Sequence, residues 1–217
     1  MADARVALVA GATGLVGREI LVRLLADKTY SAVHCVGRRK PEVVHPKLVN
    51  HLSSDFATFP SPAVDDVFIA LGTTIKVAGS QQAFRAVDFE AVVALATSAR
   101  AAGATRLGIV SAMGANATSS VFYNRVKGEM ESAVSRLGYD SVVLARPSLL
   151  SGDRSTLGQS KRPAEKFAAS AMRLLRPVTP ANYRAIAAAD VAAALVATLR
   201  ASPSGQKILL SGEMQPR

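Results

Sequence analysis

Short apolar runs alternate along the chain with longer stretches in which apolar residues recur every three or four positions. The first run covers residues 4–10, and the stretch after it, residues 15–26, has the spacing of a helix with one apolar face. Because this alternation continues to about residue 147, the chain is predicted to form parallel strands joined by helices. The predicted strands are 4–10, 32–36, 48–51, 66–71, 107–110, 141–145 and 208–210. The predicted helices are 15–26, 81–102, 122–137, 163–175 and 190–200.

Such an order predicts an α/β fold with a doubly wound parallel sheet, in which helices cover both faces as a three-layer αβα arrangement. Gly103 and Gly138 are expected to end the helices before them, and Asp190 is expected to cap the last helix. The length fits one domain over residues 1–217. After residue 147 loops rich in Ser, Gly and Pro interrupt the pattern, so residues 148–187 are expected to form a small lobe.

The formal net charge of +10 raises the question of nucleic-acid binding. Basic residues cluster at positions 38–40 and again in the stretch 154–184. Neither cluster is accompanied by an aromatic ladder, a zinc-ligand spacing or a helix-turn-helix pattern. Nucleic acid is therefore a minor hypothesis, and the second cluster is interpreted as a solvated face that leaves room for an acidic substrate.

Cys35 is the single cysteine and cannot form an internal disulfide, which indicates a reducing compartment. The chain starts without a secretory signal pattern, and its longest apolar runs fall short of the roughly 20 residues that a membrane span needs. We expect a cytoplasmic protein without a membrane span, either monomeric or homodimeric. His34, His45 and His51 are scattered along the sequence, and no metal site is predicted.

Three glycines stand at every third position where the first strand gives way to a helix, in V-A-G-A-T-G-L-V-G. Gly11 would allow a tight turn, Gly14 would let the backbone approach a pyrophosphate, and Gly17 would let the helix pack on the strand. The unpaired N–H groups of the helix N-terminus favour anions. In this strand-to-helix context the triplet predicts a dinucleotide site, the alternative being an ordinary glycine-rich turn.

The second predicted strand ends in G-R-R-K, where an NAD-binding sequence would carry an acid for the adenosine ribose. Arg38 and Arg39 suit a 2′-phosphate instead, because a guanidinium grips phosphate oxygens with two hydrogen bonds. The turn therefore predicts NADP(H) rather than NAD(H), the alternative being an exposed basic turn.

Tyr123 and Lys127 are four residues apart on a predicted helix and therefore share a face. A nearby ammonium stabilises the phenolate and is expected to lower the pKa of the tyrosine from its usual value of about 10. Ser111 ends the preceding strand, at the edge of the sheet where ligands bind in open α/β folds. Together the three residues are predicted to be catalytic. The alternatives are an exposed tyrosine beside an exposed lysine and a serine that only completes the strand end.

Seven segments in order resemble the atypical short-chain dehydrogenase/reductase superfamily, most closely the branch of the Tat-interacting-protein oxidoreductases. They are G-A-T-G-L-V-G, G-R-R-K, A-L-G-T-T, A-G-S-x-x-A-F-R-x-V-D, V-S-A-M-G-A, Y-N-R-V-K-G-E and R-P-S-L-L-S-G-D-R, and they cover nearly the whole chain. The resemblance implies a Rossmann-type fold that binds NADP(H), with the lobe at 148–187 on the substrate side.

For the reaction, the resemblance implies that Tyr123 gives or takes a proton, that Lys127 modulates it and contacts the nicotinamide ribose, and that Ser111 polarises a substrate carbonyl. The cofactor contacts that it implies fall in five groups. These are Gly11, Thr13, Gly14, Leu15, Val16 and Gly17 at the pyrophosphate; Arg38 and Arg39 at the adenosine phosphate; Asp55 at the adenine; Leu71, Gly72 and Thr73 along the cofactor; and Arg146, Pro147 and Ser148 near the carboxamide.

Two positions depart from the family pattern. The fourth predicted strand ends in L-G-T-T, where the superfamily's classical members carry an Asn-rich turn, so no catalytic asparagine is assigned. Ala112 follows Ser111, where members often carry a second serine.

Three functions fit these residues. The predicted catalytic set favours an NADP(H)-dependent oxidoreductase that transfers hydride to or from a small carbonyl or quinone-like substrate. The second is an NADP(H)-binding regulatory or protein-interaction module without turnover. The third is a nucleotide-sugar epimerase or dehydratase, against which the short tail after residue 147 counts.

Overall fold

The computed structural model describes residues 4–151, 180–201 and 204–216. The predicted helix 163–175 lies outside the described residues, as do the basic positions 154–176 and most of the predicted lobe 148–187.

Seven strands form one sheet in the order β3-β2-β1-β4-β5-β6-β9, and every neighbouring pair is parallel. Chain order thus runs outward from β1 in one direction and then from β4 in the other. The strands are β1 (Arg5–Ala10), β2 (Tyr30–Gly37), β3 (Leu48–Leu52), β4 (Asp66–Ile69), β5 (Arg106–Val110), β6 (Ser141–Arg146) and β9 (Gly205–Leu210). This is the predicted doubly wound α/β fold of the Rossmann type.

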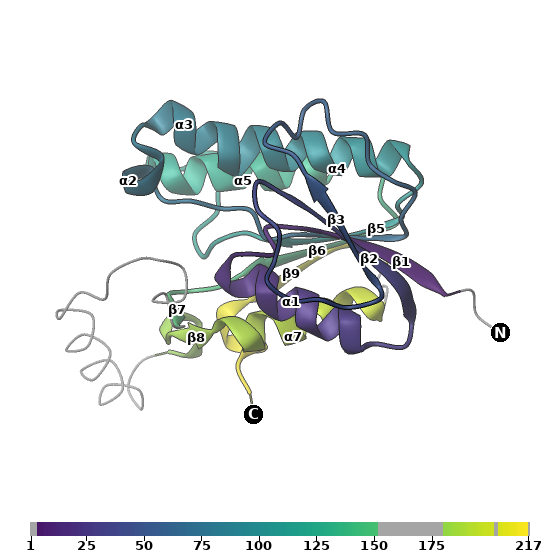
Figure 1. Cartoon of the computed structure of the whole chain (residues 1–217). Helices are drawn as coiled ribbons and strands as arrows, with labels where there is room; N and C mark the ends of the chain where they lie inside the picture. Colours follow the sequence, from purple (N-terminus) through teal and green to yellow (C-terminus); the bar gives the residue numbers. More distant parts are fainter. Residues whose placement is uncertain (1–3, 152–179, 202–203, 217) are drawn as a thin grey trace.

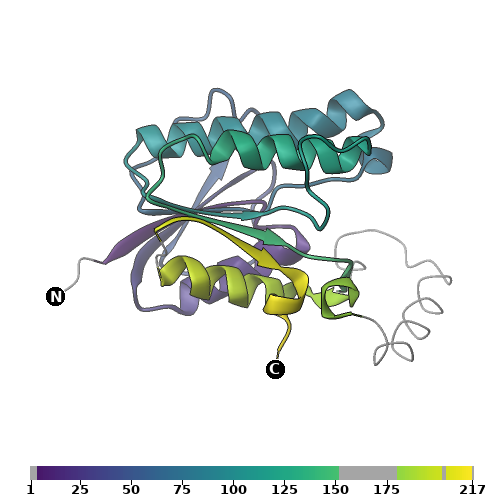
Figure 2. The same cartoon turned by 180° about the vertical axis from the view of Figure 1, so that it is seen from behind.

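Helices cover both faces of the sheet, with α2 to α5 on one face and α1 and α7 on the other (Figures 1 and 2). Their bounds are α1 (Leu15–Ala26), α2 (Ile75–Ala78), α3 (Gln81–Arg85), α4 (Ala91–Ala101), α5 (Phe122–Val134) and α7 (Ala188–Arg200). None of the described helices has the length and apolar character needed to cross a bilayer. Shorter elements are the helical turns η1 (Ala86–Glu90), η3 (Ala181–Tyr183) and η4 (Ser211–Met214) and the two-stranded parallel pair β7 (Leu150–Ser151) and β8 (Ile186–Ala187).

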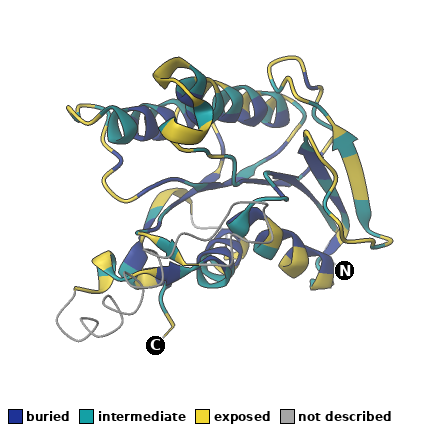
Figure 3. Cartoon of the chain, turned by 60° about the vertical axis from the view of Figure 1, so that its left-hand side comes forward, coloured by how far each residue is buried: buried dark blue, intermediate teal, exposed yellow. Residues whose placement is uncertain are grey.

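Each face of the sheet has its own apolar core. One core joins α1 and α7 to the sheet through residues such as Ile20 and Leu195. The other joins α4 and α5 through residues such as Leu95 and Met130. The central strands are largely buried, and β3 at the sheet edge is largely exposed (Figure 3). Burial on both faces explains why the central strands read as near-continuous apolar runs.

Two helices differ from their predicted form. The helix predicted over residues 81–102 is divided into α3, the π-helical turn η1 and α4, because the N–H of Ala91 bonds to the carbonyl of Ala86, five residues back. The last helix begins at Ala188 and not at a cap formed by Asp190, which lies in its first turn instead. A carboxylate there still interacts favourably with the helix dipole.

The chain order reverses between β1 and β4, which are neighbours in the sheet. In open α/β sheets a crevice forms at the carboxyl ends of the strands at such a reversal. The segments after β1, β4, β5 and β6 therefore surround the expected ligand position.

Candidate functional site

The glycine turn links β1 to α1 and brings the chain very close to its neighbours. Gly11 has a φ of +83°, and a Cβ on it would lie 2.5 Å from the carbonyl oxygen of Ala70, next to β4. A Cβ on Gly17 would lie 2.1 Å from the carbonyl oxygen of Gly11. These two glycines are required by the fold itself, whether or not a ligand binds.

Gly14 differs from the other two glycines. It is the N-cap of α1 with extended backbone angles, and a Cβ there would have one near neighbour, the Gly11 carbonyl oxygen at 3.3 Å. Protein packing therefore leaves the position nearly open. The first turn of α1 contains no acidic residue that would repel an anion. Thr13 and Leu15 are half-buried beside it, and Val16 is buried.

The basic turn follows β2 directly. Arg38 and Arg39 are exposed, and neither guanidinium has a hydrogen bond or ion pair with another described residue. Both cations are therefore available to an anionic ligand at the carboxyl edge of the sheet.

Asp55 lies in the loop after β3 with an exposed carboxylate. That carboxylate accepts hydrogen bonds from the Ala57 N–H and the Thr58 hydroxyl, each at 2.9 Å. The bond from Thr58, followed by that from Ala57, lowers the pKa of Asp55. In this structure Asp55 stabilises its own loop, and the predicted adenine contact stays a prediction.

Ser111 and Tyr123 line one cavity of about 200 Å³. Ser111 follows β5, is 5% exposed, and its Oγ has no hydrogen-bond partner among the described residues. Buried hydroxyls are normally paired, so an unpaired one at the carboxyl edge of the sheet is suited to a ligand oxygen. The seven described residues that line the cavity are uncharged: Ser111, Ala112, Met113, Tyr123, Pro147, Ser148 and Leu150.

The tyrosine and lysine of α5 lie in a buried environment. The Tyr123 ring packs on Phe84 of α3, with ring centroids 5.3 Å apart. Burial raises the pKa of Tyr123, while the Lys127 charge works in the opposite direction and Asp88 adds to the rise. Lys127 therefore acts on this pKa in the expected direction, but the pKa of Tyr123 in the protein alone lies above its usual value and not below it, because the desolvation of the phenolate outweighs the ammonium.

Asp88 is the site residue that sequence reasoning missed. It lies in η1, is 1% exposed, and its Oδ1 is 2.7 Å from the Nζ of Lys127. Its Oδ2 accepts a 2.9 Å hydrogen bond from the N–H of Thr73, in the loop after β4 that also holds Leu71 and Gly72. The aspartate closes one of the segments that resemble the superfamily, but its partners are distant in the sequence.

The residues after β6 divide between two pockets. Pro147 and Ser148 line the cavity of Ser111, where the Ser148 hydroxyl donates to the carbonyl of Arg184 and accepts from Ser211. Arg146 instead lines a pocket of about 680 Å³ between α5 and the strands β6 and β9. Its guanidinium donates to both carboxylate oxygens of Glu131, at 3.0 and 2.5 Å.

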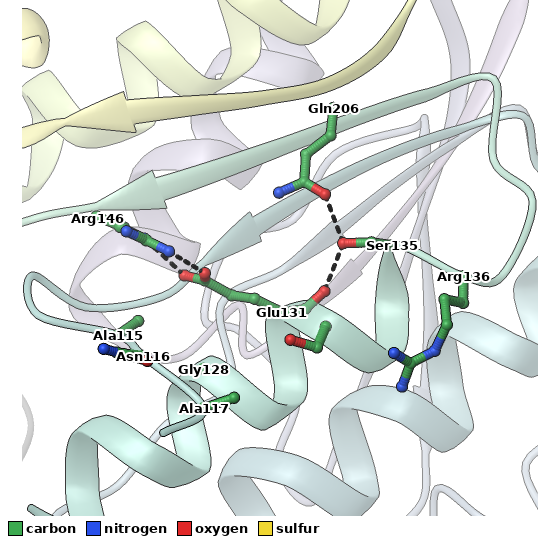
Figure 4. Close-up of a pocket in the computed structure, with 10 residues that line it drawn as sticks. Ala115, Asn116, Ala117, Gly128, Glu131, Ser135, Arg136, Arg146 and Gln206 are labelled. Carbon is green, nitrogen blue, oxygen red and sulfur yellow. Dashed lines mark hydrogen bonds and ion pairs between the residues drawn. The ribbon is translucent and has the colours of Figure 1, made fainter. Parts of the chain in front are cut away.

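Figure 4 shows that this larger pocket is lined by groups already bonded to each other. Besides the Arg146–Glu131 pair, the Ser135 hydroxyl lies within hydrogen-bond distance of the side chain of Gln206 on β9 and of the backbone carbonyl of Glu131. These contacts fasten α5 to the sheet. None of the predicted catalytic side chains lines this pocket.

His34 and His51, which are far apart in the sequence, lie together on β2 and β3. Nδ1 of His34 is 2.8 Å from Nε2 of His51, and burial followed by the His51 charge lowers the pKa of His34. Within the described ranges no three His, Cys, Asp or Glu side chains form a group that could hold a metal ion.

No protein-family model matches the chain. It is 35% identical over 175 residues to the mitochondrial protein fmp52 of Emericella nidulans, across 76% of this chain and 73% of that protein. It is 38% identical over 175 residues to the mitochondrial protein fmp52 of Aspergillus fumigatus, across 75% of this chain and 71% of that protein. The chain belongs to the Fmp52 family.

These Fmp52 relatives are named as mitochondrial, which contradicts the cytoplasmic location expected from the sequence. That expectation rested on an unpaired cysteine and on the lack of a secretory signal. Both features argue against export, and neither distinguishes the cytosol from a mitochondrion.

Solved structures share the fold of this Fmp52 family member at low sequence identity. A short-chain dehydrogenase family protein from Francisella tularensis superposes with a TM-score of 0.69 at 12% identity, over 97% of this chain and 99% of that chain. MoeE5 in complex with UDP-glucose and NAD gives a TM-score of 0.68 at 18% identity, over 94% of this chain and 74% of that chain. The human epimerase family protein SDR39U1 with NADPH gives a TM-score of 0.63 at 18% identity, over 94% of this chain and 74% of that chain.

Proposed function

We propose that this Fmp52 family member is an oxidoreductase of the atypical short-chain dehydrogenase type that uses NADP(H) and reduces a small, uncharged carbonyl or quinone-like substrate. The observation that carries the proposal is the unpaired buried hydroxyl of Ser111 in the same cavity as Tyr123. The uncharged lining of that cavity supports a substrate without a charged group at its reacting end.

The residues present fit a nicotinamide dinucleotide. Gly14 leaves room for a pyrophosphate at the N-terminus of α1, and Arg38 and Arg39 are exposed cations without a partner among the described residues. When bound, the cofactor supplies the hydride that reduces the carbonyl carbon.

The chain's own residues act on the carbonyl oxygen. The hydroxyl of Ser111 donates a hydrogen bond to that oxygen and polarises the C=O bond. Burial raises the pKa of Tyr123, so the phenol carries its proton at neutral pH and can donate it as the alcohol forms. Lys127, 3% exposed, places a positive charge near the phenolate that remains.

Turnover tests the proposal. The purified protein should oxidise NADPH in the presence of at least one member of a panel of aldehydes, ketones and quinones. Tyr123→Phe should lower kcat by about 100-fold or more while leaving NADPH affinity within about twofold, because only the proton donor is lost. NADPH binding without oxidation by any substrate would favour the regulatory module instead.

Cofactor choice is tested separately at the basic turn. Arg38→Ala with Arg39→Ala should weaken NADPH binding by about tenfold or more and leave NADH binding nearly unchanged, because only NADPH carries the 2′-phosphate. Equal losses for the two cofactors would contradict the proposed preference for NADP(H).

The nucleotide-sugar alternative rests on structures that share the fold alone, one of them in complex with UDP-glucose. Activity on UDP-sugars without activity on simple carbonyls would favour it. The mitochondrial names of the relatives support a mitochondrial location for this protein, and the resemblance to the Tat-interacting-protein branch stays a proposal at branch level.

A further inference from the structure

Asp88 connects two parts of the proposed site that come from different segments of the chain. One carboxylate oxygen pairs with the ammonium of Lys127 on α5 at 2.7 Å. The other accepts the backbone N–H of Thr73, in the loop after β4, at 2.9 Å. A single side chain therefore contacts both the predicted catalytic lysine and the predicted cofactor wall.

The π-helical turn places this side chain. Between α3 and α4 the helix widens by one residue per turn, so that Ala91 bonds to Ala86 in place of Val87. Such turns are costly and are frequent at functional sites. One extra residue in a helix changes the direction of the side chains on its two sides relative to each other by roughly 100°, so the turn affects which side chains can face α5.

Both members of the ion pair are almost fully buried, Asp88 at 1% and Lys127 at 3% exposure. A buried ammonium without a partner is strongly disfavoured, and the carboxylate compensates it. On the loop side, Gly72 also lies beside Asp88, since a Cβ on Gly72 would be in van der Waals contact with Oδ1 at 3.5 Å.

We propose that Asp88 is a positioning residue that holds the Lys127 ammonium beside Tyr123 and fixes the Thr73 loop against the cofactor site. The inference rests on the proposed function, because it gives Lys127 and Thr73 the roles assigned there. Asp88 itself touches neither substrate nor cofactor in this proposal.

The charges around Tyr123 make the role measurable. Lys127 on its own helix lowers the pKa of the phenol and Asp88 on η1 raises it, after the larger effect of burial. From α3 the packed neighbour is Phe84, while Arg85 is occupied in an ion pair with Glu129. Removing the Asp88 charge and removing the Lys127 charge should therefore move the Tyr123 titration in opposite directions.

The test is a tyrosinate absorbance titration of the full-length protein without cofactor or substrate. Each variant is compared with its own Tyr123→Phe partner, so that the difference isolates one phenol among four tyrosines. Lys127→Met should raise the apparent pKa of Tyr123, and Asp88→Asn should lower it while Lys127 stays charged. The isosteric Asn keeps an oxygen for the Thr73 N–H and protects the fold. The control is Glu129→Gln, which removes a partly exposed carboxylate from α5, the helix of Tyr123 and Lys127. It should leave the titration of Tyr123 unchanged.

NADPH affinity supplies the second readout. Asp88→Ala leaves the Thr73 N–H unpaired and should weaken NADPH binding by about tenfold, while Asp88→Asn should recover most of the loss. No shift of the Tyr123 titration for Asp88→Asn, or a shift of equal size for Glu129→Gln, would overturn the inference. The titration needs no turnover, so its result is independent of the proposed function. The inference about Asp88 can fail in a protein that reduces carbonyls, and it can hold in a protein for which no substrate is found.

Discussion

Two buried serines in this protein have hydroxyls without a hydrogen-bond partner among the described residues, and they lie at opposite edges of the sheet. Ser141 begins β6, at the amino edge of the sheet. Ser111 follows β5, at the carboxyl edge, and lines the cavity shared with Tyr123. The cavity beside Ser111 offers a place for a substrate oxygen, which is why the proposed chemistry uses Ser111.

This contrast gives a matched pair of variants. Ser111→Ala should lower kcat/KM for carbonyl reduction by about 100-fold or more, because the carbonyl oxygen loses a preorganised donor in a buried cavity. Ser141→Ala should leave kcat/KM within about twofold of the wild type. Neither change breaks a side-chain hydrogen bond to another described residue, so thermal unfolding should be nearly unaffected in both. Steady-state kinetics that show equal losses for the two variants would remove Ser111 from the mechanism.

Local spacing was sufficient to find Tyr123, Lys127 and Ser111, since a four-residue spacing on a helix and a serine at a strand end are visible in the sequence. It was not sufficient for the electrostatics. The ion pair of Lys127 with Asp88 and the burial that raises the pKa of Tyr123 depend on helices packing together, and no local pattern reports that.

In the turn from β1 to α1, two of the glycines are required by protein packing, and one is left open for a ligand. Gly17 and Gly11 approach each other too closely for any side chain, whereas Gly14 has room for a methyl group at the cost of a small adjustment. The motif alone suggested a role for each glycine, and the structure shows which of these roles are intramolecular.

Alanine substitutions should separate the two roles. Gly14→Ala should fold with a Tm close to that of the wild type and bind NADPH at least about tenfold more weakly, because the new methyl group occupies the path of the pyrophosphate. Gly17→Ala should unfold at much lower denaturant, or fail to fold, because its Cβ would meet a backbone oxygen at 2.1 Å. Unchanged NADPH affinity in a folded Gly14→Ala protein would argue against a phosphate at this turn.

The interruption of the helix over residues 81–102 could not be predicted from the sequence. Its alanine-rich sequence carries no Pro or Gly between Gln81 and Ala101, so periodicity predicts one continuous helix. The π-helical turn coincides with tertiary contacts of Asp88 and Phe84, which the sequence of a single helix does not reveal.

For the whole molecule, alternation of strand and helix was enough to predict the parallel sheet, because buried parallel strands read as apolar runs and their connections as amphipathic helices. The pairing of β7 with β8 was not predictable, since two-residue strands leave no periodic signal. Cellular location was predicted wrongly, because an unpaired cysteine and the lack of a secretory pattern do not distinguish the cytosol from a mitochondrion.

The stability of the whole fold should fall at alkaline pH. Burial raises the pKa of the Cys35 thiol to about 12 and also raises the pKa values of Tyr30 and Tyr139. The unfolded chain therefore loses these protons first, so stability is fully present at neutral pH and declines as pH rises above the usual values of these groups. Between neutral pH and a pH of about 10, the free energy of unfolding should fall by about 2 kcal/mol, mostly through the thiol.

Denaturant unfolding at several pH values measures this decline, and Cys35→Ala is the matched variant. It should lose only about 1 kcal/mol over the same range, because among the thiol and phenol groups only Tyr30, Tyr123 and Tyr139 still have a raised pKa. A decline as steep as that of the wild type would show that other groups control the alkaline transition.

A crystal structure of the protein soaked with NADPH would test the proposed site most directly. Density should place the pyrophosphate at Gly14, the 2′-phosphate at Arg38 and Arg39, and the nicotinamide beside the cavity of Ser111 and Tyr123. A nucleotide bound instead in the pocket of Glu131 and Arg146, or with its nicotinamide turned away from Tyr123, would contradict the proposed enzyme.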